Sequence, residues 1–209
     1  MEDLIKSALG AAKADYIELR IHEGSATNIN FTGKELEAIS EGDSIGGCVR
    51  ALVKGGWGFV AFNDIENLPN YVKTAVEQAG FLANSTLTLA PIPLTTEYVK
   101  TKVKIDPRSV SLAEKHDLCQ KYNNIILSSK KIQTSGVRYM DSHGTQHFAN
   151  SEGSLIVQEV TFCGINLLAI TKEGMNIQRA WESVGDLRGY QIVQGLEDKC
   201  EDITHRAVD

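Results

Sequence analysis

Residues 44–62 read SIGGCVRALVKGGWGFVAF, and this stretch decides the fold. It consists of two apolar runs separated by Gly55-Gly56. Such a pair is typical of a tight hairpin turn, because both central residues of a type I′ turn need positive φ. The second run, residues 57–62, is apolar on both faces. We therefore expect it to be a central strand that a helix covers.

The flanking segments predict a small α+β layer around this hairpin. Downstream, Asn67 and Pro69 suit the start of a helix, and the residues that follow recur at a spacing of 3.6. Upstream, residues 16–23 alternate as a half-buried strand, and residues 26–31 and 34–40 predict two more strands. An amphipathic helix is expected at residues 4–12.

The second half of the chain has a different pattern. Residues 85–108 hold three of the four prolines, which predicts an extended connection. Ser111 and Glu114 form a capping box at the start of a helix. Residues 132–183 predict an antiparallel meander of about four strands. Its turn signals lie at residues 141–144, 150–153 and 172–174.

The fold class expected from these patterns is α+β, with two domains that each pack antiparallel β-strands against α-helices. We assign residues 1–84 to an N-terminal domain, 85–108 to a linker and 109–209 to a middle domain. The last apolar residues recur at helical spacing up to the final residues, without a Gly or Pro stop signal. We therefore expect a truncated piece of a longer protein.

Composition excludes several classes of protein. The chain has 209 residues, 42% hydrophobic and 23% charged, as in ordinary globular proteins. The net charge of −6 disfavours direct binding of nucleic acid. No stretch predicts a membrane span or a signal peptide, so we expect a cytoplasmic protein. The cysteines form no CxxC pair and are expected to be reduced thiols: Cys48, Cys119, Cys163 and Cys200.

No catalytic constellation stands out. His143 and His147 are four apart in a strand and turn region, where they lie too far apart to share an ion, so we interpret them as hairpin surface residues. Asp141, Ser142 and His143 are adjacent in sequence, which does not make a triad. The glycines match no phosphate-binding motif. Trp57 could stack a ligand, although packing is its more common role.

Four stretches of the sequence, two in each half of the chain, resemble the TldD/PmbA family, also called modulators of DNA gyrase. Residues 14–24, ADYIELRIHEG, and residues 41–68, EGDSIGGCVRALVKGGWGFVAFNDIENL, resemble its N-terminal domain. Residues 135–153, SGVRYMDSHGTQHFANSEG, and 173–190, EGMNIQRAWESVGDLRGY, resemble its middle domain. VKGGWGFVAF is slightly more similar to the TldD type.

The resemblance implies a paired metallopeptidase complex that cleaves unfolded peptides or trims peptide precursors. Its TldD-type subunit carries a zinc motif, His-Glu-x-x-x-His, after the middle domain, and its PmbA-type partner lacks that motif. This chain does not contain the motif, so we expect no catalytic residue and no metal ligand in it, and we expect zinc only beyond Asp209 of a TldD-type parent. The residues carried over as a substrate-binding or structural family motif are Gly47, Arg50, Gly55, Trp57, Gly58, Asn150 and Glu152.

Three roles remain open at this stage. The chain could form a peptide-binding wall through its sheet edges, with the loop residues Asn150 and Glu152 at the site. It could instead build the interface of a homo- or hetero-oligomer with a TldD/PmbA-type subunit. Binding to gyrase or DNA is the third role, and the net charge weakens it.

Overall fold

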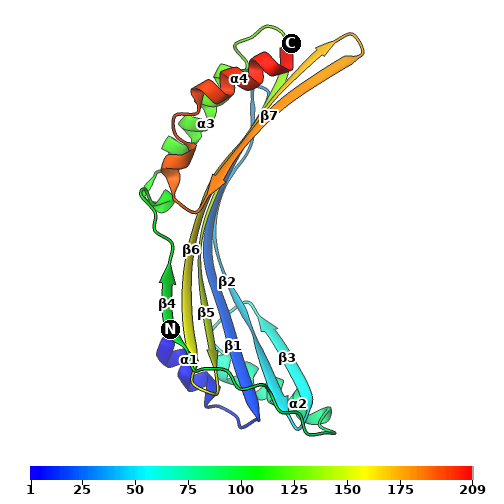
Figure 1. Cartoon of the computed structure of the whole chain (residues 1–209), viewed down its shortest axis with the longest axis vertical. Coiled ribbons are helices and arrows are strands. Elements are labelled where there is room, and N and C mark those ends of the chain that lie inside the picture. Colours follow the sequence, from blue (N-terminus) through cyan, green and yellow to red (C-terminus); the bar gives the residue numbers. More distant parts are fainter. Residues whose placement is uncertain (209) are drawn as a thin grey trace. The chain divides into compact units, whose positions relative to one another are not determined.

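The computed structural model describes residues 1–208, and over this range the chain has an α+β fold with four α-helices and one seven-stranded sheet (Figure 1). The helices are α1 (Glu2–Leu9), α2 (Leu68–Phe81), α3 (Leu112–Ile126) and α4 (Glu197–Val208). The strands are β1 (Tyr16–Thr32), β2 (Glu35–Val53), β3 (Gly56–Phe62), β4 (Thr96–Lys100), β5 (Ile132–Asn150), β6 (Leu155–Glu173) and β7 (Asn176–Asp186). Two short 3₁₀ helices, η1 (Pro107–Ser109) and η2 (Tyr190–Val193), complete the list.

The sheet is mainly antiparallel, and its strand order is β3-β2-β1-β5-β6-β4, with β7 also paired to β6. The pairs β2–β3 and β6–β7 are antiparallel, whereas the short strand β4 runs parallel to β6. β4 lies inside the predicted connection, residues 85–108.

Four strands are much longer than the sequence pattern predicts. β1 has 17 residues, and β2, β5 and β6 have 19 each, against about five or six in an ordinary strand. The predicted strands at 16–23 and 26–31 are one continuous strand. The predicted turn at residues 141–144 is wrong, because these residues lie within β5. The region 132–183 therefore has three strands rather than four.

The hairpin of residues 44–62 is confirmed, with a shift of one residue at its turn. Val53 pairs with Gly56, so the turn residues are Lys54, with φ of 44°, and Gly55, with φ of 84°. The prediction that the second strand is central is wrong, since β3 is an edge strand. Only one of its faces packs on a helix, and Phe59 on the other face is 57% exposed.

The described chain forms two compact units, and each combines separate segments of sequence. Unit 1 comprises Met1–Gly24, Asp43–Lys100 and Gly144–Glu159. Unit 2 comprises Ser25–Gly42, Thr101–His143 and the chain from Val160 onward. The predicted boundaries at 1–84, 85–108 and 109–209 stay a prediction.

The core of unit 1 lies between its strands and the helices α1 and α2. Its buried apolar side chains include Ile5 of α1, Leu19 of β1, Val49 of β2 and Val72 of α2. α2 packs directly on β3. The predicted start of α2 is confirmed, with Asn67 at the N-cap position, although the Asn67 side chain accepts no capping hydrogen bond from the backbone.

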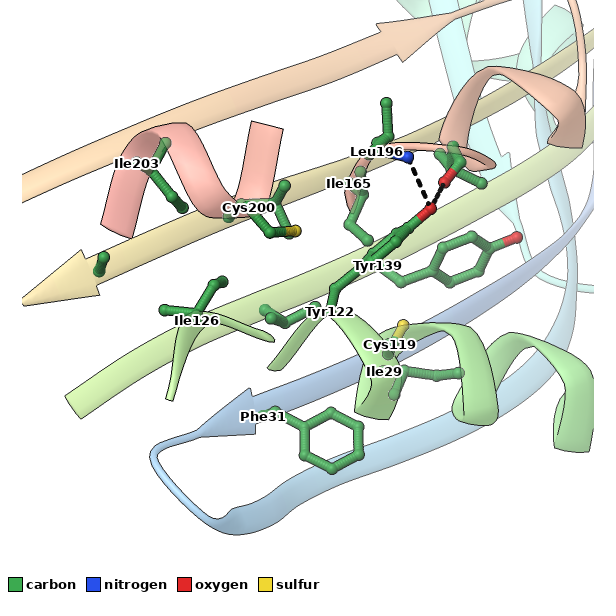
Figure 2. Close-up of a cluster of buried hydrophobic side chains, with 14 of the residues drawn as sticks. Ile29, Phe31, Cys119, Tyr122, Ile126, Tyr139, Ile165, Leu196, Cys200 and Ile203 are labelled. Carbon is green, nitrogen blue, oxygen red and sulfur yellow. Dashed lines mark hydrogen bonds between the residues drawn. The ribbon is translucent and has the colours of Figure 1, made fainter. Parts of the chain in front are cut away.

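The core of unit 2 lies between its strands and the helices α3 and α4, which pack against each other. The capping box at the start of α3 is confirmed: Ser111 and Glu114 each accept a hydrogen bond from the other's backbone N–H. Figure 2 shows the Tyr122 hydroxyl at the centre of this core, where it donates to the Val193 carbonyl at 2.7 Å and accepts from the Leu196 N–H at 3.1 Å. These two bonds attach η2 and the start of α4 to α3.

Candidate functional site

Unit 1 carries a charged and aromatic face on its sheet, opposite the helices. Alternation along β1 points Ile17 and Leu19 into the helical core and points Tyr16, Glu18 and Arg20 to the other side. Arg50 of β2 and Trp57 of β3 join these residues on that side. We call the set Tyr16, Glu18, Arg20, Arg50 and Trp57 the arginine face.

Glu18 binds both arginines of the arginine face. Its carboxylate is buried, and Oε1 accepts hydrogen bonds from Arg20 Nε and from Arg50 Nη1, both at 3.3 Å. The other oxygen, Oε2, accepts from the Tyr16 hydroxyl at 3.0 Å. Because one carboxylate holds two guanidinium groups, the three residues keep one net positive charge. The two arginine side chains are 58% and 45% exposed.

Aromatic rings fix the directions of both arginines. The Arg50 guanidinium lies over the Trp57 ring, with 4.7 Å to the centroid, and the Arg20 guanidinium lies over the Phe148 ring at 5.0 Å. Tyr16 meets Trp57 edge to face, with the centroids 6.3 Å apart. Each guanidinium donates one of its five N–H groups to Glu18, so most of its donors stay available to a ligand.

An open pocket of about 470 Å³ adjoins Arg20. Its walls come from four neighbouring strands of unit 1, and they combine an aromatic ring, two imidazoles and two side-chain amides. The lining residues are Arg20, Ile21, His22, Gly47, Gln146, His147, Phe148, Ile156 and Gln158.

Asn150 has a structural role at the turn between β5 and β6. Its Oδ1 accepts hydrogen bonds from Gly153 N at 3.0 Å and Ser154 N at 2.9 Å. Within the described residues its buried Nδ2 has no hydrogen bond of ordinary geometry. Burial raises the pKa of Tyr16, the neighbouring Asn150 amide opposes this rise, and Glu18 adds to it. Asn150 therefore joins the arginine face through Tyr16.

The other predicted site residues lie in the same unit. Gly58 lets α2 approach β3, because a Cβ there would lie 1.9 Å from the Ala75 carbonyl oxygen. Gly47 meets the backbone of Arg20 in the same way, at 2.1 Å. Gly55 supplies the positive φ of the hairpin turn. These glycines shape the sheet rather than present chemistry.

Glu152 is exposed in the turn after β5, and its charge is the smallest of the effects that raise the pKa of Tyr16. The turn is held to β1 by its neighbour Ser151, whose backbone N–H donates to Ile17 O at 2.8 Å. The structure thus brings Arg50 and Trp57 into direct contact, places Asn150 beside Tyr16, and leaves Glu152 on the turn.

The sequence interpretation missed four residues of this region: Tyr16, Glu18, Arg20 and Phe148. The available signal was the segment YIELRIH, in which oppositely charged residues two apart share one strand face. That pattern is also typical of an ordinary solvated face. The burial of Glu18 follows only from the pairing of β1 with its neighbours.

The two histidines considered earlier make separate contacts. His143 Nδ1 lies 3.0 Å from Thr161 Oγ1. His147 is buried, which corrects its assignment to the surface, and its Nε2 lies 3.8 Å from Glu23 Oε1. Burial lowers the pKa of His147, and the Glu23 charge opposes that effect.

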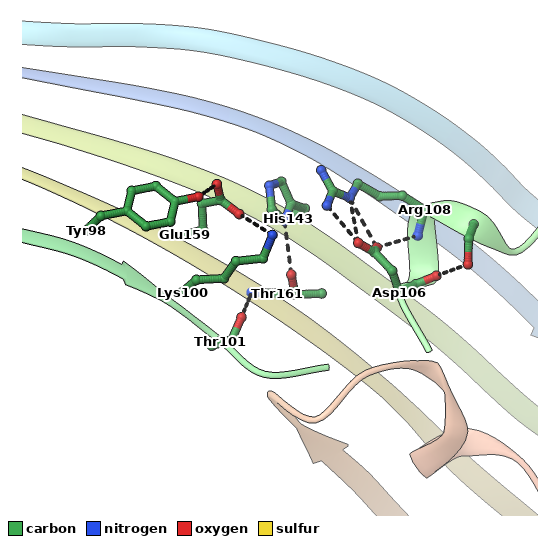
Figure 3. Close-up of polar contacts among 9 residues, drawn as sticks. Tyr98, Lys100, Thr101, Asp106, Arg108, His143, Glu159 and Thr161 are labelled. Carbon is green, nitrogen blue, oxygen red and sulfur yellow. Dashed lines mark hydrogen bonds and ion pairs between the residues drawn. The ribbon is translucent and has the colours of Figure 1, made fainter. Parts of the chain in front are cut away.

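A second set of polar contacts attaches β4 to β6 in unit 1. Figure 3 shows the Glu159 carboxylate of β6 accepting a hydrogen bond from the Tyr98 hydroxyl and pairing with Lys100. Lys100 Nζ lies 3.3 Å from Glu159 Oε2. In unit 2, Arg108 donates to the Asp106 carboxylate and holds the pKa of that carboxyl below its usual range. These contacts fix the backbone of exposed segments.

Unit 2 contains a buried ion pair. Lys115 Nζ lies 2.7 Å from Asp141 Oδ2 and donates to Thr27 Oγ1 at 3.1 Å. The Tyr139 hydroxyl donates to the same Asp141 oxygen at 2.5 Å, and the Cys163 thiol lies 3.6 Å from the Tyr139 hydroxyl oxygen. All five side chains are buried, so this network is a part of the core.

The side chains of residues 1–208 do not fit a zinc site. No group of three or more His, Cys, Asp or Glu residues among them lies close enough together to hold a metal ion. All four cysteines are free thiols. Burial raises the pKa of Cys119 and Cys200 to about 12 and that of Cys163 to about 11, so these thiols stay protonated and are poor metal ligands.

Among the described residues, none of the helices is long and apolar enough to cross a bilayer.

Comparison with known proteins assigns the family. Residues 105–209 match the PmbA/TldA metallopeptidase central domain, and residues 17–79 match the PmbA/TldA metallopeptidase domain 1. A metalloprotease of Synechocystis sp. is 35% identical over 199 residues, which are 94% of this chain and 43% of the relative. A metalloprotease of Methanocaldococcus jannaschii is 32% identical, covering 82% of this chain and 39% of the relative.

Solved structures share the fold. A protein described as a modulator of a DNA gyrase from Thermotoga maritima aligns with 99% of this chain and 47% of its own, at a TM-score of 0.83 and 14% identity. TldE from Thermococcus kodakarensis aligns with all of this chain and 46% of its own, at a TM-score of 0.67 and 18% identity. The chain spans about two fifths of the length of the curated relatives. It belongs to the PmbA/TldD metallopeptidase family and comprises the family's domain 1 and central domain.

Proposed function

We propose that the chain supplies scaffold, subunit-interface and peptide-groove surfaces to a TldD/PmbA-like zinc metallopeptidase system of the cytoplasm, which cleaves unfolded peptides or trims peptide precursors. The observation that carries the proposal is the arginine face with the open pocket of about 470 Å³ beside it. Membership of a metallopeptidase family supports the choice of a peptide as the ligand.

The pocket has the chemistry of a site for an extended chain. Phe148 and Ile156 offer apolar contact to a side chain, while the amides of Gln146 and Gln158 can donate to and accept from peptide groups. Hydrogen bonds to the peptide groups of a ligand give binding with little sequence selectivity, because every peptide sequence offers those groups. A peptidase that acts on unfolded chains of many sequences needs such a surface.

In such a system this chain binds and orients the peptide, and the zinc chemistry belongs elsewhere. A zinc ion would supply a bound water of lowered pKa to such a system. We assign that chemistry to a His-Glu-x-x-x-His region, which is expected beyond Asp209 of a TldD-type parent. Purified chain dialysed against zinc and measured by atomic absorption is expected to hold much less than one zinc per molecule. Stoichiometric zinc with peptide hydrolysis abolished by a chelator would contradict the assignment.

The partner of the chain is a second proposal. The exposed apolar side chains of β7 support a subunit interface, either in a homo-oligomer or with a TldD/PmbA-type subunit. The hairpin is slightly more similar to the TldD type, and the alternative is the non-catalytic PmbA type. The alternative is an interaction with DNA gyrase, because the Thermotoga maritima protein is described as a modulator of that enzyme. Salt-dependent binding to duplex DNA or to gyrase would support this alternative.

Titration of an unstructured peptide onto the purified chain tests the groove. Phe148→Ala removes the aromatic wall and is expected to weaken binding about tenfold, as loss of a buried aromatic contact does at interfaces. Phe81→Ala is the matched control, because Phe81 lies in the same unit at the end of α2 and is 87% exposed. Equal affinities for the two variants, or no binding by the unmodified chain, would contradict the proposed groove.

A further inference from the structure

Two arginines of the arginine face, Arg20 and Arg50, share one buried carboxylate, that of Glu18. Glu18 is 6% exposed, yet its two partners place their guanidinium groups at the surface. One guanidinium would balance the charge of the buried Glu18 carboxylate, so the two pairs together hold more positive charge than the neutralisation of Glu18 requires. Their geometry holds two cationic groups side by side with free N–H donors.

We infer that Arg20 and Arg50 bind the C-terminal carboxylate of an extended peptide whose last residues lie in the adjoining pocket. This inference rests on the proposed peptide groove and names the group that the groove recognises. Arginine suits the task because its planar fork of donors matches the two oxygens of a carboxylate.

Charge and desolvation both favour an anion at this position. Glu18 neutralises one of the two guanidinium charges and leaves one net positive charge, which a carboxylate would balance. The Trp57 and Phe148 rings stack on the two guanidiniums and shield one side of each from water. Arginine tolerates this partial desolvation because a guanidinium is weakly hydrated.

The position of Arg20 and Arg50 relative to the pocket favours the C-terminal carboxylate of a peptide over the carboxylate of a side chain. The pocket runs from Gln158 of β6 across Phe148 of β5 to Arg20 of β1, which are neighbouring strands. Two strand spacings amount to about 10 Å, or about three residues of extended chain. Arg50 lies beyond the pocket and is covered by Trp57 of the edge strand β3, so a peptide crossing the strands would end at the arginines.

The test compares two forms of one peptide by calorimetry with the whole chain. An N-acetylated pentapeptide of alanine and leucine is used with a free C-terminal carboxylate and as its C-terminal amide. The free acid is expected to bind about 10- to 100-fold more tightly, as expected for hydrogen bonds to a charged group. Arg50→Gln is expected to reduce the affinity of the acid to that of the amide. Arg179→Gln, which removes the same charge from an exposed position of β7, is expected to leave the difference intact.

Each contrary outcome has its own meaning. Equal binding of acid and amide by the unmodified chain overturns the carboxylate inference while leaving the groove in place, and this comparison does not depend on how any variant folds. Binding of neither form overturns the groove and the inference together. An amidated peptide with one internal aspartate that binds as tightly as the free acid shows that the arginines select a side chain, which overturns the C-terminal assignment.

Discussion

At the scale of single residues, the buried pair of Lys115 and Asp141 makes the sharpest prediction. Lys115→Met leaves the Asp141 carboxylate buried without its cation and is expected to lower the free energy of unfolding by about 3–5 kcal/mol. Urea denaturation measures this loss. Lys121→Met is the control, because Lys121 pairs with Glu197 at the surface of the same helix and is expected to cost at most about 1 kcal/mol. Similar losses for both variants would contradict the assignment of Lys115 to the core.

His147 predicts how stability depends on pH. Burial holds the pKa of His147 below the ordinary histidine value of about 6.5, so below pH 6.5 the unfolded chain binds the proton more readily than the folded chain. The stability contribution of His147 is therefore present above pH 6.5 and is lost as the pH falls below it. His147→Gln is expected to flatten this part of the profile of unfolding free energy between pH 7.5 and 5.5. An unchanged slope in the variant would show that other groups cause it.

The residues of the arginine face mark the limit of prediction from sequence. Arg50 and Trp57 are in contact and Asn150 lies beside Tyr16, in a hairpin and a turn that have strong local signals, while the role of these residues in a site stays a prediction. Glu18 and Arg20 carry no local signal that separates them from an ordinary exposed strand face. Their role depends on which strands lie beside β1, and that is decided by contacts distant in sequence.

At the scale of elements, the contact of α2 with β3 depends on the absence of a side chain at Gly58. A Cβ at Gly58 would lie 1.9 Å from the Ala75 carbonyl oxygen, so Gly58→Ala is expected to push the helix away and to cost about 1–3 kcal/mol. Gly80→Ala is the matched control on the same helix. Nothing lies within 4 Å of its added Cβ, and it is expected to stabilise the chain by about 0.5–1 kcal/mol. Thermal unfolding measures both changes, and effects of the same sign would contradict this account of the packing.

The elements also show which patterns predict structure well. The capping box of Ser111 and Glu114 and the helical stripe after Asn67 are encoded within a few residues, and both helices were placed correctly. The long strands were divided wrongly, because Gly and polar residues such as those at 141–144 are local turn signals. In β5 the pairing with neighbouring strands overrides these signals.

At the scale of the whole molecule, β7 is a strand that pairs only with β6 among the described strands. Ile177 and Trp181 lie two strand repeats apart on one face and are 60% and 63% exposed, and Met175 in the preceding turn is fully exposed. Exposed apolar side chains gathered on one strand are typical of an interaction surface. We therefore expect this strand to be an interface.

Sedimentation velocity over a range of concentrations tests the interface. The unmodified chain is expected to associate as its concentration rises, more strongly at high salt, because a net charge of −6 makes copies repel one another and salt screens that repulsion. Trp181→Lys is expected to shift the equilibrium to the monomer, since it places a charge where apolar contact is needed. Phe81→Lys makes an equal change of charge at an exposed apolar residue of unit 1 and is expected to leave association unchanged. A chain that stays monomeric at all concentrations and also fails to bind a TldD/PmbA-type subunit would remove the case for β7 as an interface.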